Sequence, residues 1–501
     1  MLGRLTQLFT KGGRKSGKSG KSKSYMNFDM LYQLSYMAVI ASGGVPRGQI
    51  FERAAQLPCS SAEYFRRIEL ASKKLKYDYA RACRLVGEGA EEEDVKGMLL
   101  RFSSSLISGE PEAEFLAREA EAVAENYDNE YNRKLEAMKM WSDAYVSLIL
   151  SAVLVIIIGI VSTMIWKIET TIIMGMAFIA IATTATGVWL IYLVSPREMV
   201  VLGWAGSHEQ RLTRKLLKLA LPIAVVAGAL LLILGTNLGF VLLVVAAVVF
   251  PVGYIVTSDD NKVTRRDIEV GTFLRSLGGV CAALGTTVGA ALNRLDLDSI
   301  NNLRQSVSRL RTRLVAGIKT KLCWSKFIDE TGSELANRSV GMFYDAVDLG
   351  GAPDQAGYQT SLFANRIAML RARRKTVTGP FRWLCLAMHG SVVVLLVFIT
   401  EVIMAFSSMV TRAQDSMPSV SGAPSMASFS SFNLSGLEIM HTLVIPLVLI
   451  FTVANALAPT IADGGSKFKV LYNLAFTAAV SGVSLAFLPS IAAALFQSIQ
   501  V

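Results

Sequence analysis

Residues 145–166 read YVSLILSAVLVIIIGIVSTMIW, a run of 22 residues without a charged side chain. A helix rises about 1.5 Å per residue and the hydrocarbon core of a bilayer is about 30 Å thick, so this run is long enough to cross a membrane. Because lipid offers the backbone no hydrogen-bond partner, a single span of this kind is expected to be an α-helix. The stretch therefore predicts an all-α integral membrane protein.

Six further apolar runs follow, which makes the chain polytopic with about seven transmembrane helices. The predicted spans are Tyr145–Trp166, Ile172–Val194, Leu219–Leu234, Leu238–Val256, Phe381–Val410, Met440–Ile461 and Leu471–Phe496. The first four form two tight hairpins and return the chain to its starting side. The polar lobes before and after them are therefore predicted to share one compartment.

Charge predicts the orientation of these spans. With both lobes inside, 22 Lys and Arg precede the first span, 5 lie between the second and third, and 19 lie from Lys262 to Arg382. The predicted outer segments hold only Lys167 and Arg412. Since inner segments carry the excess of basic residues, we expect a multi-pass protein of the cytoplasmic membrane, with its N-terminus inside and its C-terminus outside.

Five parts are predicted from composition and periodicity. Both lobes show helical rather than strand-like periodicity, so each is expected to be a helical bundle. The first lobe holds 15 basic and 20 acidic residues, net −5, and the second holds 18 and 12, net +6. The parts are a disordered basic tail at 1–24, the first lobe at 25–143, a four-helix membrane block at 144–256, the second lobe at 257–380, and a three-helix membrane block at 381–501 with an outer Ser-rich loop at 411–439. The N-terminus lacks the apolar core of a signal peptide.

Helix boundaries inside the lobes are predicted from caps and breakers. Ser60 or Ser61 is expected to cap one helix, and Ser258 or Asp259 is expected to cap the first helix of the second lobe. A long helix is expected to start at Pro111 and to continue into the first membrane span.

The two lobes are similar to each other at an offset of 241 residues. Tyr32–Val39 aligns with Phe273–Val280, and glycines recur at the turns that follow. A glycine there allows the first helix of each lobe to stop and reverse. Chance similarity between amphipathic helices is the alternative to a duplicated module. The turn positions singled out are Gly44, Pro46, Gly285 and Gly289.

No catalytic, cofactor-binding or metal-binding constellation is predicted. Gly12–Ser19 matches the phosphate-binding loop pattern, but it lies in a low-complexity tail without the strand and helix that such a loop requires. The five cysteines show no metal-type spacing and are expected to be reduced, and the three histidines form no HExxH pattern. We therefore expect no enzyme activity, no cofactor and no nucleic-acid partner.

Candidate interaction residues are concentrated on one helix of the second lobe. Its predicted apolar stripe is Ile300, Leu303, Val307, Leu310 and Leu314. From its other faces project four arginines, which either dock on an acidic partner surface or merely face water: Arg304, Arg309, Arg311 and Arg313. Glu401 is a carboxylate inside a predicted span, where an acid is either paired structurally or used in transport. Asn433 begins an Asn-Leu-Ser glycosylation sequon on the predicted outer face.

The order of these parts resembles the type II secretion F-domain family, the polytopic platform proteins of type IV pilus-like machines. The stretches Leu34–Ala55 and Phe273–Leu292 look like the openings of two copies of that domain, and Phe102–Leu116 looks like its second helix-turn-helix. Ala454–Tyr472 looks like the late membrane segment of the archaeal branch, which builds the archaellum and related pili. Four spans between the lobes also favour the archaeal-type architecture.

The resemblance implies a platform that couples a cytoplasmic secretion ATPase to the insertion of pilin-like subunits into a filament. The implied partners are membrane lipid, the ATPase and the pilin-like subunits, and we expect a homodimer. The alternative is a small-solute transporter or permease, which would require several polar or ionisable residues at the middle of the membrane.

Overall fold

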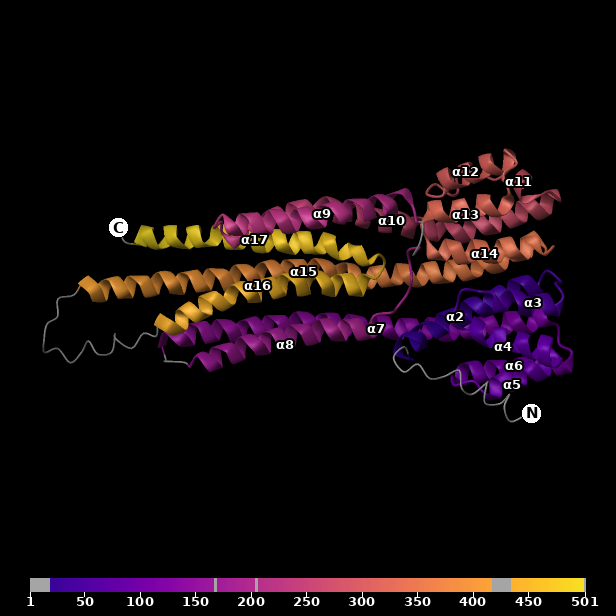
Figure 1. The fold of residues 1–501 in the computed structure, drawn as a ribbon, viewed down its shortest axis with the longest axis horizontal. Helices are drawn as coiled ribbons and strands as arrows, with labels where there is room; N and C mark the ends of the chain where they lie inside the picture. Colours follow the sequence, from indigo (N-terminus) through magenta and orange to yellow (C-terminus); the bar gives the residue numbers. More distant parts are fainter. Residues whose placement is uncertain (1–18, 166–168, 203–205, 417–433, 500–501) are drawn as a thin grey trace. The chain divides into compact units, whose positions relative to one another are not determined.

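The computed structural model describes residues 19–165, 169–202, 206–416 and 434–499 (Figure 1). Across these ranges the chain is α-helical, with one isolated β-bridge between Val201 and Ser333. The predicted all-α fold class is confirmed.

Seven of the described helices are long and apolar enough to cross a membrane, as predicted. A continuous apolar run of this length satisfies its backbone within the helix and can face lipid on its outer side. They are α7 (Glu112–Ile165), α8 (Thr170–Val194), α9 (His208–Ile233), α10 (Leu238–Leu284), α15 (Pro353–Ser416), α16 (Leu434–Asp463) and α17 (Val470–Ile499).

Three of these helices extend from a lobe into a membrane span without a break. The prediction of a long helix after Pro111 is confirmed, because α7 begins at Glu112 and continues through the first span. The predicted cap at Ser258 or Asp259 is wrong, because α10 passes through both positions. The buried Asp259 carboxylate instead accepts a hydrogen bond from the Gln210 side-chain amide at 3.1 Å.

The remaining helices build the two lobes. The first lobe contains α2 (Ser19–Ala41), α3 (Arg47–Ala55), α4 (Ala62–Leu75), α5 (Tyr79–Glu88) and α6 (Glu93–Ser108). The second contains α11 (Val288–Ala291), α12 (Arg304–Val315), α13 (Thr320–Thr331) and α14 (Glu334–Asp348). Ser61 precedes α4 as expected, but its hydroxyl makes no capping bond and donates to the Asp29 carbonyl oxygen at 3.0 Å.

Each lobe has an aromatic core. In the first lobe, Phe51 stacks on Tyr79 and on Phe102, with ring centroids 4.5 and 5.4 Å apart. In the second, Phe273 contacts Trp324 and Phe327 at 6.4 and 5.5 Å. These buried rings are large apolar surfaces that hold each bundle together.

Helix starts and left-handed turns repeat between the lobes at the offset of 241 seen in the sequence. Helices α3, α5, α6 and α7 start at residues 47, 79, 93 and 112, and α11, α13, α14 and α15 start at 288, 320, 334 and 353. Positive φ angles recur at the same offset in three pairs: Gly44 with Gly285, Lys76 with Gly317, and Gly109 with Gly350. The second lobe therefore repeats the backbone path of the first.

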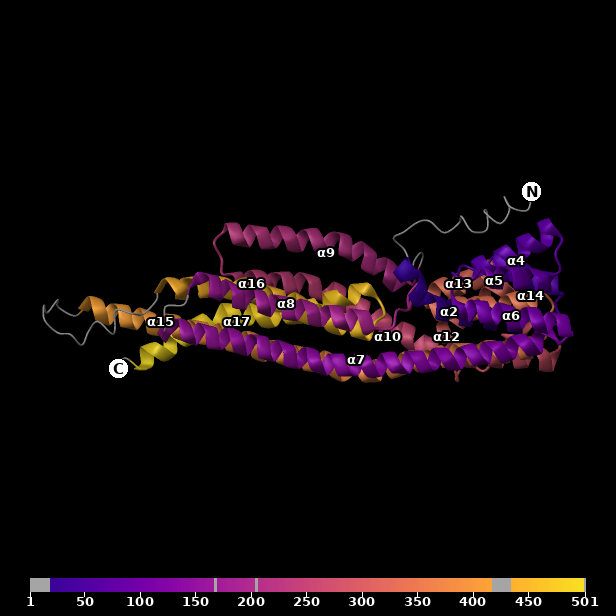
Figure 2. The ribbon, with the colours of Figure 1, turned by 90° about the horizontal axis from the view of Figure 1, so that it is seen from below.

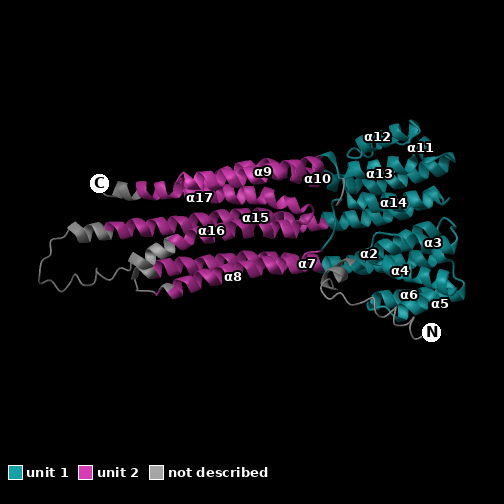
Figure 3. Cartoon of the chain, in the orientation of Figure 1, with its two compact units in different colours: residues 1–133, 197–208, 261–372 teal, residues 134–196, 209–260, 373–501 magenta. Residues whose placement is uncertain are grey.

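The chain divides into two compact units (Figure 3). Unit 1 comprises residues 1–133, 197–208 and 261–372, which hold both lobes and a connecting segment. Unit 2 comprises residues 134–196, 209–260 and 373–501, which hold the apolar spans.

Within unit 2, the spans differ in how much of their surface is covered. The most apolar stretch of α16 is 61% buried, whereas that of α9 is 11% buried, and α9 lies at the edge of the bundle (Figure 2). Helix α16 packs on both α8 and α17, which accounts for its greater burial.

Candidate functional site

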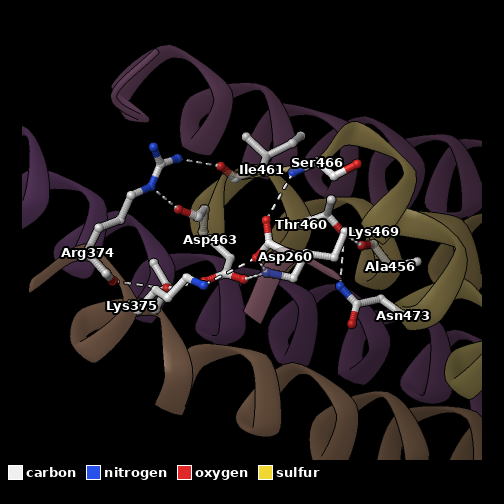
Figure 4. Close-up of polar contacts among 12 residues, drawn as sticks. Asp260, Arg374, Lys375, Ala456, Thr460, Ile461, Asp463, Ser466, Lys469 and Asn473 are labelled. Atoms are coloured by element: carbon white, nitrogen blue, oxygen red, sulfur yellow. Dashed lines mark hydrogen bonds and ion pairs between the residues drawn. The ribbon is translucent and has the colours of Figure 1, made fainter. Parts of the chain in front are cut away.

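A cluster of buried ion pairs lies where α16 turns into α17 through a short 3-10 helix, η4 (Lys467–Lys469), in unit 2 (Figure 4). The Asp260 carboxylate on α10 accepts from the ammonium groups of Lys469 at 2.9 Å and Lys375 at 3.2 Å. Lys469 also pairs with Asp463 at the end of α16. Asp260 and Lys469 are almost fully buried, so each charge depends on the other for compensation.

The turn that carries this cluster requires two glycines. Gly464 and Gly465 have φ angles of +70° and +80°, a region that side chains disfavour. A Cβ on Gly464 would lie 2.7 Å from the guanidinium carbon of Arg374, and one on Gly465 would overlap the Asp260 carboxylate. The Gly-Gly sequence therefore serves both the backbone turn and the close approach of two charged side chains.

Arg374 uses its buried guanidinium to join α15 to two other backbone segments of unit 2. It donates to the carbonyl oxygens of Pro196 and Ala462, both at 2.8 Å, and to that of Ile461 at 3.0 Å. A further bond reaches the Ser195 hydroxyl at 2.7 Å. Arginine has five donors in a fixed fork, which suits it to satisfy several carbonyl groups at helix ends at once.

One helical turn earlier on α15, Arg371 performs a similar role inside unit 1. Its guanidinium pairs with Glu198 at 2.9 Å and Asp267 at 2.7 Å, and donates to the Met199 carbonyl oxygen at 3.2 Å. In the sequence, both arginines belong to the 19 basic residues from Lys262 to Arg382. The structure shows that they are buried connectors between α15 and the segment after α8.

A second ion-pair cluster joins the two lobes within unit 1. Arg338 on α14 pairs with Asp29 on α2 at 3.3 Å and with Glu334 at 3.0 Å. Its guanidinium carbon lies 4.7 Å from the Phe28 ring centroid and 4.6 Å from that of Tyr32. Burial lowers the pKa of Arg338, but the carboxylates of Glu334 and Asp29 outweigh burial and raise it, so the guanidinium stays charged.

The lobe contact continues along α2. The Tyr36 hydroxyl donates to the Asp345 carboxylate at 2.7 Å. Burial, reinforced by Asp345, raises the pKa of Tyr36 and keeps this hydroxyl protonated as a donor. The sequence suggested neither the Tyr36–Asp345 contact nor the Asp29–Arg338 contact, because the two residues of each pair lie 309 positions apart.

A network of Tyr, Asn, His, Ser and Thr groups lies among the apolar spans of unit 2. The Tyr145 hydroxyl donates to the Asn455 amide oxygen at 2.9 Å, and the Asn455 amide nitrogen lies 3.1 Å from His389 Nδ1. The His389 Nε2 atom lies 3.0 Å from the Ser481 hydroxyl and 3.1 Å from the Thr477 carbonyl oxygen. These interhelical bonds satisfy polar groups for which lipid offers no hydrogen-bond partner.

Glu401, the carboxylate predicted inside a span, lies elsewhere on α15 and is half-buried.

The four arginines predicted to face a partner lie on α12 and differ in burial and in ion pairing. Arg313 is partly buried and pairs with Glu330 on α13, and Arg309 lies 4.0 Å from the same carboxylate. Arg304 pairs with the exposed Asp298 at 3.1 Å, and Arg311 is exposed. Of the predicted apolar stripe, Ile300, Leu303, Val307 and Leu310 are buried and Leu314 is partly buried, but the first two precede α12 and do not lie on the helix.

The predicted turn glycines also separate into two groups. Gly44 and Gly285 have φ angles of +70° and +57°, so the backbone favours glycine at both. Gly289 lies inside α11, where a Cβ would meet only an ordinary contact at 3.8 Å, so it is not a turn residue. Pro46 immediately precedes α3. Asn433 and residues 12–18 of the phosphate-loop pattern Gly12–Ser19 lie outside the described residues.

The contacts in these clusters join helices to one another. Among the described residues, no group of three or more His, Cys, Asp and Glu side chains is placed to hold a metal ion. All five cysteines are free thiols. What the clusters do is fix α10, α15 and the α16–α17 turn in unit 2, and α2 and α14 in unit 1.

These observations define a polytopic α-helical membrane protein with two helical lobes of matching backbone path. The chain is similar to "Flagella accessory protein J" of Methanocaldococcus jannaschii, with 23% identity over 418 residues that cover 79% of this chain and 71% of that protein. It is also similar to the protein of that name from Methanococcus voltae, with 23% identity over 349 residues that cover 66% of this chain and 61% of that relative, which is less than two thirds of its length. No protein-family model and no solved structure matches the chain.

Proposed function

We propose that the protein is the membrane platform of an archaellum or a related type IV filament, of the type II secretion F-domain kind. The observation that carries this proposal is the combination of seven apolar helices with two lobes of matching backbone path, together with similarity to two flagella accessory proteins. In this proposal the lobes are duplicated F-domains that bind a cytoplasmic ATPase. The apolar spans of unit 2 receive pilin-like subunits and pass them to the filament.

The buried connectors suit this role. A platform must transmit force from a soluble motor to a subunit in the membrane. The two arginines one turn apart on α15 bind carbonyl and carboxylate groups of the segment after α8, within unit 1 and within unit 2. Helices that are tied at such points transmit displacement through packed contacts rather than through a flexible linker.

The transporter alternative gains no support from the polar groups of the spans. The polar network around His389 is bonded between helices, which is typical of structural packing in a membrane. A solute path would require a polar site at interrupted helices in matched halves of the bundle.

Copurification from native membranes tests the proposed function. A tagged chain, extracted in mild detergent, is expected to bring down the secretion ATPase and pilin-like proteins of the same cell. Deletion of the gene is expected to abolish filament assembly without lowering the amount of either partner. Normal filaments in the deletion strain would refute the proposal.

Labelling of introduced cysteines tests the proposed orientation. With the lobes in the cytoplasm, an impermeant maleimide applied to intact cells is expected to label Ser430→Cys and to leave Ser104→Cys and Ser308→Cys unlabelled. Ser104 and Ser308 are exposed in the lobes, so both are expected to react after the membrane is permeabilised. Labelling of Ser104→Cys in intact cells would reverse the orientation.

A further inference from the structure

The turn between α12 and α13 exposes three large apolar side chains close together in the sequence. Val315 ends α12, Ile318 lies in the turn, and Leu322 lies in the first turn of α13, with exposed fractions of 67%, 41% and 51%. The turn itself is well ordered by backbone bonds, since the Ile318 amide donates to the Arg313 carbonyl oxygen at 3.2 Å. Clustered exposed apolar residues in a soluble lobe mark an interaction surface more often than isolated ones do.

The first lobe provides an internal comparison for this surface. At the offset of 241, the same three positions are Lys74, Tyr77 and Arg81. There the Arg81 guanidinium carbon lies 4.5 Å from the Tyr77 ring centroid, which gives a water-compatible surface. The backbone turn is the same in both lobes, with a left-handed residue at Lys76 and at Gly317. The fold therefore does not require apolar side chains here, and their presence in the second lobe needs a different cause.

Basic residues flank the three apolar residues in the sequence. The segment from 309 to 322, RLRTRLVAGIKTKL, contains five basic residues and no acidic one. Arg311, Lys319 and Lys321 are exposed. The corresponding segment of the first lobe, 68–81, includes Glu69 and Asp78. An apolar centre with a charged rim is the usual organisation of a protein–protein interface, and this rim favours a partner surface rich in carboxylates.

We infer that Val315, Ile318 and Leu322, with the basic rim around them, form the docking site for the cytoplasmic ATPase, through an apolar surface edged by carboxylates. This inference rests on the proposed function and adds to it the surface and the kind of contact. The second lobe binds the motor at this turn, and the first lobe does not use the equivalent turn. The apolar centre supplies most of the affinity, and the arginines and lysines accelerate and orient association.

Binding of the purified ATPase to the full-length chain in nanodiscs tests the inference. The triple variant Val315→Ser, Ile318→Ser, Leu322→Ser is expected to weaken binding at least about tenfold at low and at moderate salt, because the loss is apolar. The variant Arg309→Glu, Arg311→Glu is expected to weaken binding chiefly at low salt. These side chains are exposed, so both variants are expected to keep the thermal stability of the parent.

Matched variants in the first lobe serve as controls. Lys74→Ser with Tyr77→Ser and Arg81→Ser alters the equivalent turn, and Ile107→Ser removes an apolar side chain that is 70% exposed on α6. Neither is expected to change ATPase binding more than about twofold.

The outcomes separate the inference from the function on which it rests. Unchanged ATPase binding in the apolar triple variant overturns the docking site while leaving the platform function in place. Absence of ATPase binding by the parent chain overturns both. If the triple variant instead loses self-association, or loses binding to vesicles of anionic lipid while keeping the ATPase, the surface belongs to a second copy or to the membrane and the inference fails.

Discussion

Replacement of Asp260 by alanine is expected to cost the protein up to about 3–5 kcal/mol of stability, because the buried Lys469 ammonium loses its most deeply buried carboxylate and keeps only its pair with Asp463. Lys375 loses the same partner, but it is more exposed and can turn toward water. The backbone amide of Ser466, which donates to Asp260 at 3.3 Å, loses its acceptor as well. The expected result is a large fall in the thermal midpoint of the detergent-solubilised protein, measured by fluorescence-detected size exclusion.

An exposed ion pair provides the matched control. Asp298 pairs with Arg304 at 3.1 Å on the surface of the second lobe, and its side chain is 80% exposed. Its replacement by alanine is expected to cost about 0–1 kcal/mol. Adding Lys469→Met and Asp463→Asn to Asp260→Ala removes the buried ammonium together with its other carboxylate, and is expected to restore part of the lost stability. Equal effects of Asp260→Ala and Asp298→Ala would show that the cluster is hydrated and contributes little.

The sequence was sufficient to predict the spans and the helical lobes because their signals are local. A run such as residues 145–166 has one stable structure in lipid, whatever the rest of the chain does. Pro111 and Gly109 likewise determine the start of α7 and the end of α6 from their own backbone preferences. The cap predicted at Ser258 or Asp259 is wrong because the apolar span and the lobe helix form one continuous helix, α10. The Asp259 carboxylate accepts from the Gln210 side chain of a neighbouring helix rather than from a backbone amide at a helix start.

The ion-pair clusters could not be predicted because their members are far apart in the sequence. Asp260 and Lys469 each lie at the edge of an apolar run, where a charged residue is typical of a span end facing headgroups. Only the three-dimensional path brings them to 2.9 Å. The Gly464-Gly465 pair was the one local sign, since two adjacent glycines at a turn often accompany a close approach.

Arg338→Met is the second substitution with a large expected effect, and it tests whether the two lobes act as one body. The methionine keeps the bulk of the side chain against Phe28 and Tyr32 but removes the charge between Asp29 and Glu334. Two buried carboxylates then lack their cation, and we expect a loss of about 3–5 kcal/mol. Hydrogen exchange is expected to become faster in both α2 and α14, because the lobe contact opens before either lobe unfolds.

Arg366→Met is the control for Arg338→Met, because it also removes an arginine that joins the lobes but one that is more accessible to water. Arg366 pairs with Glu121 at 2.7 Å and Asp128 at 3.4 Å. Arg366→Met is therefore expected to cost about 0–1 kcal/mol and to leave exchange in α2 unchanged. If Arg338→Met raises exchange throughout the second lobe but not in α2, the residue stabilises α14 alone. A rise in α2 and α14 together means that the Arg338 contact holds the two lobes together within unit 1.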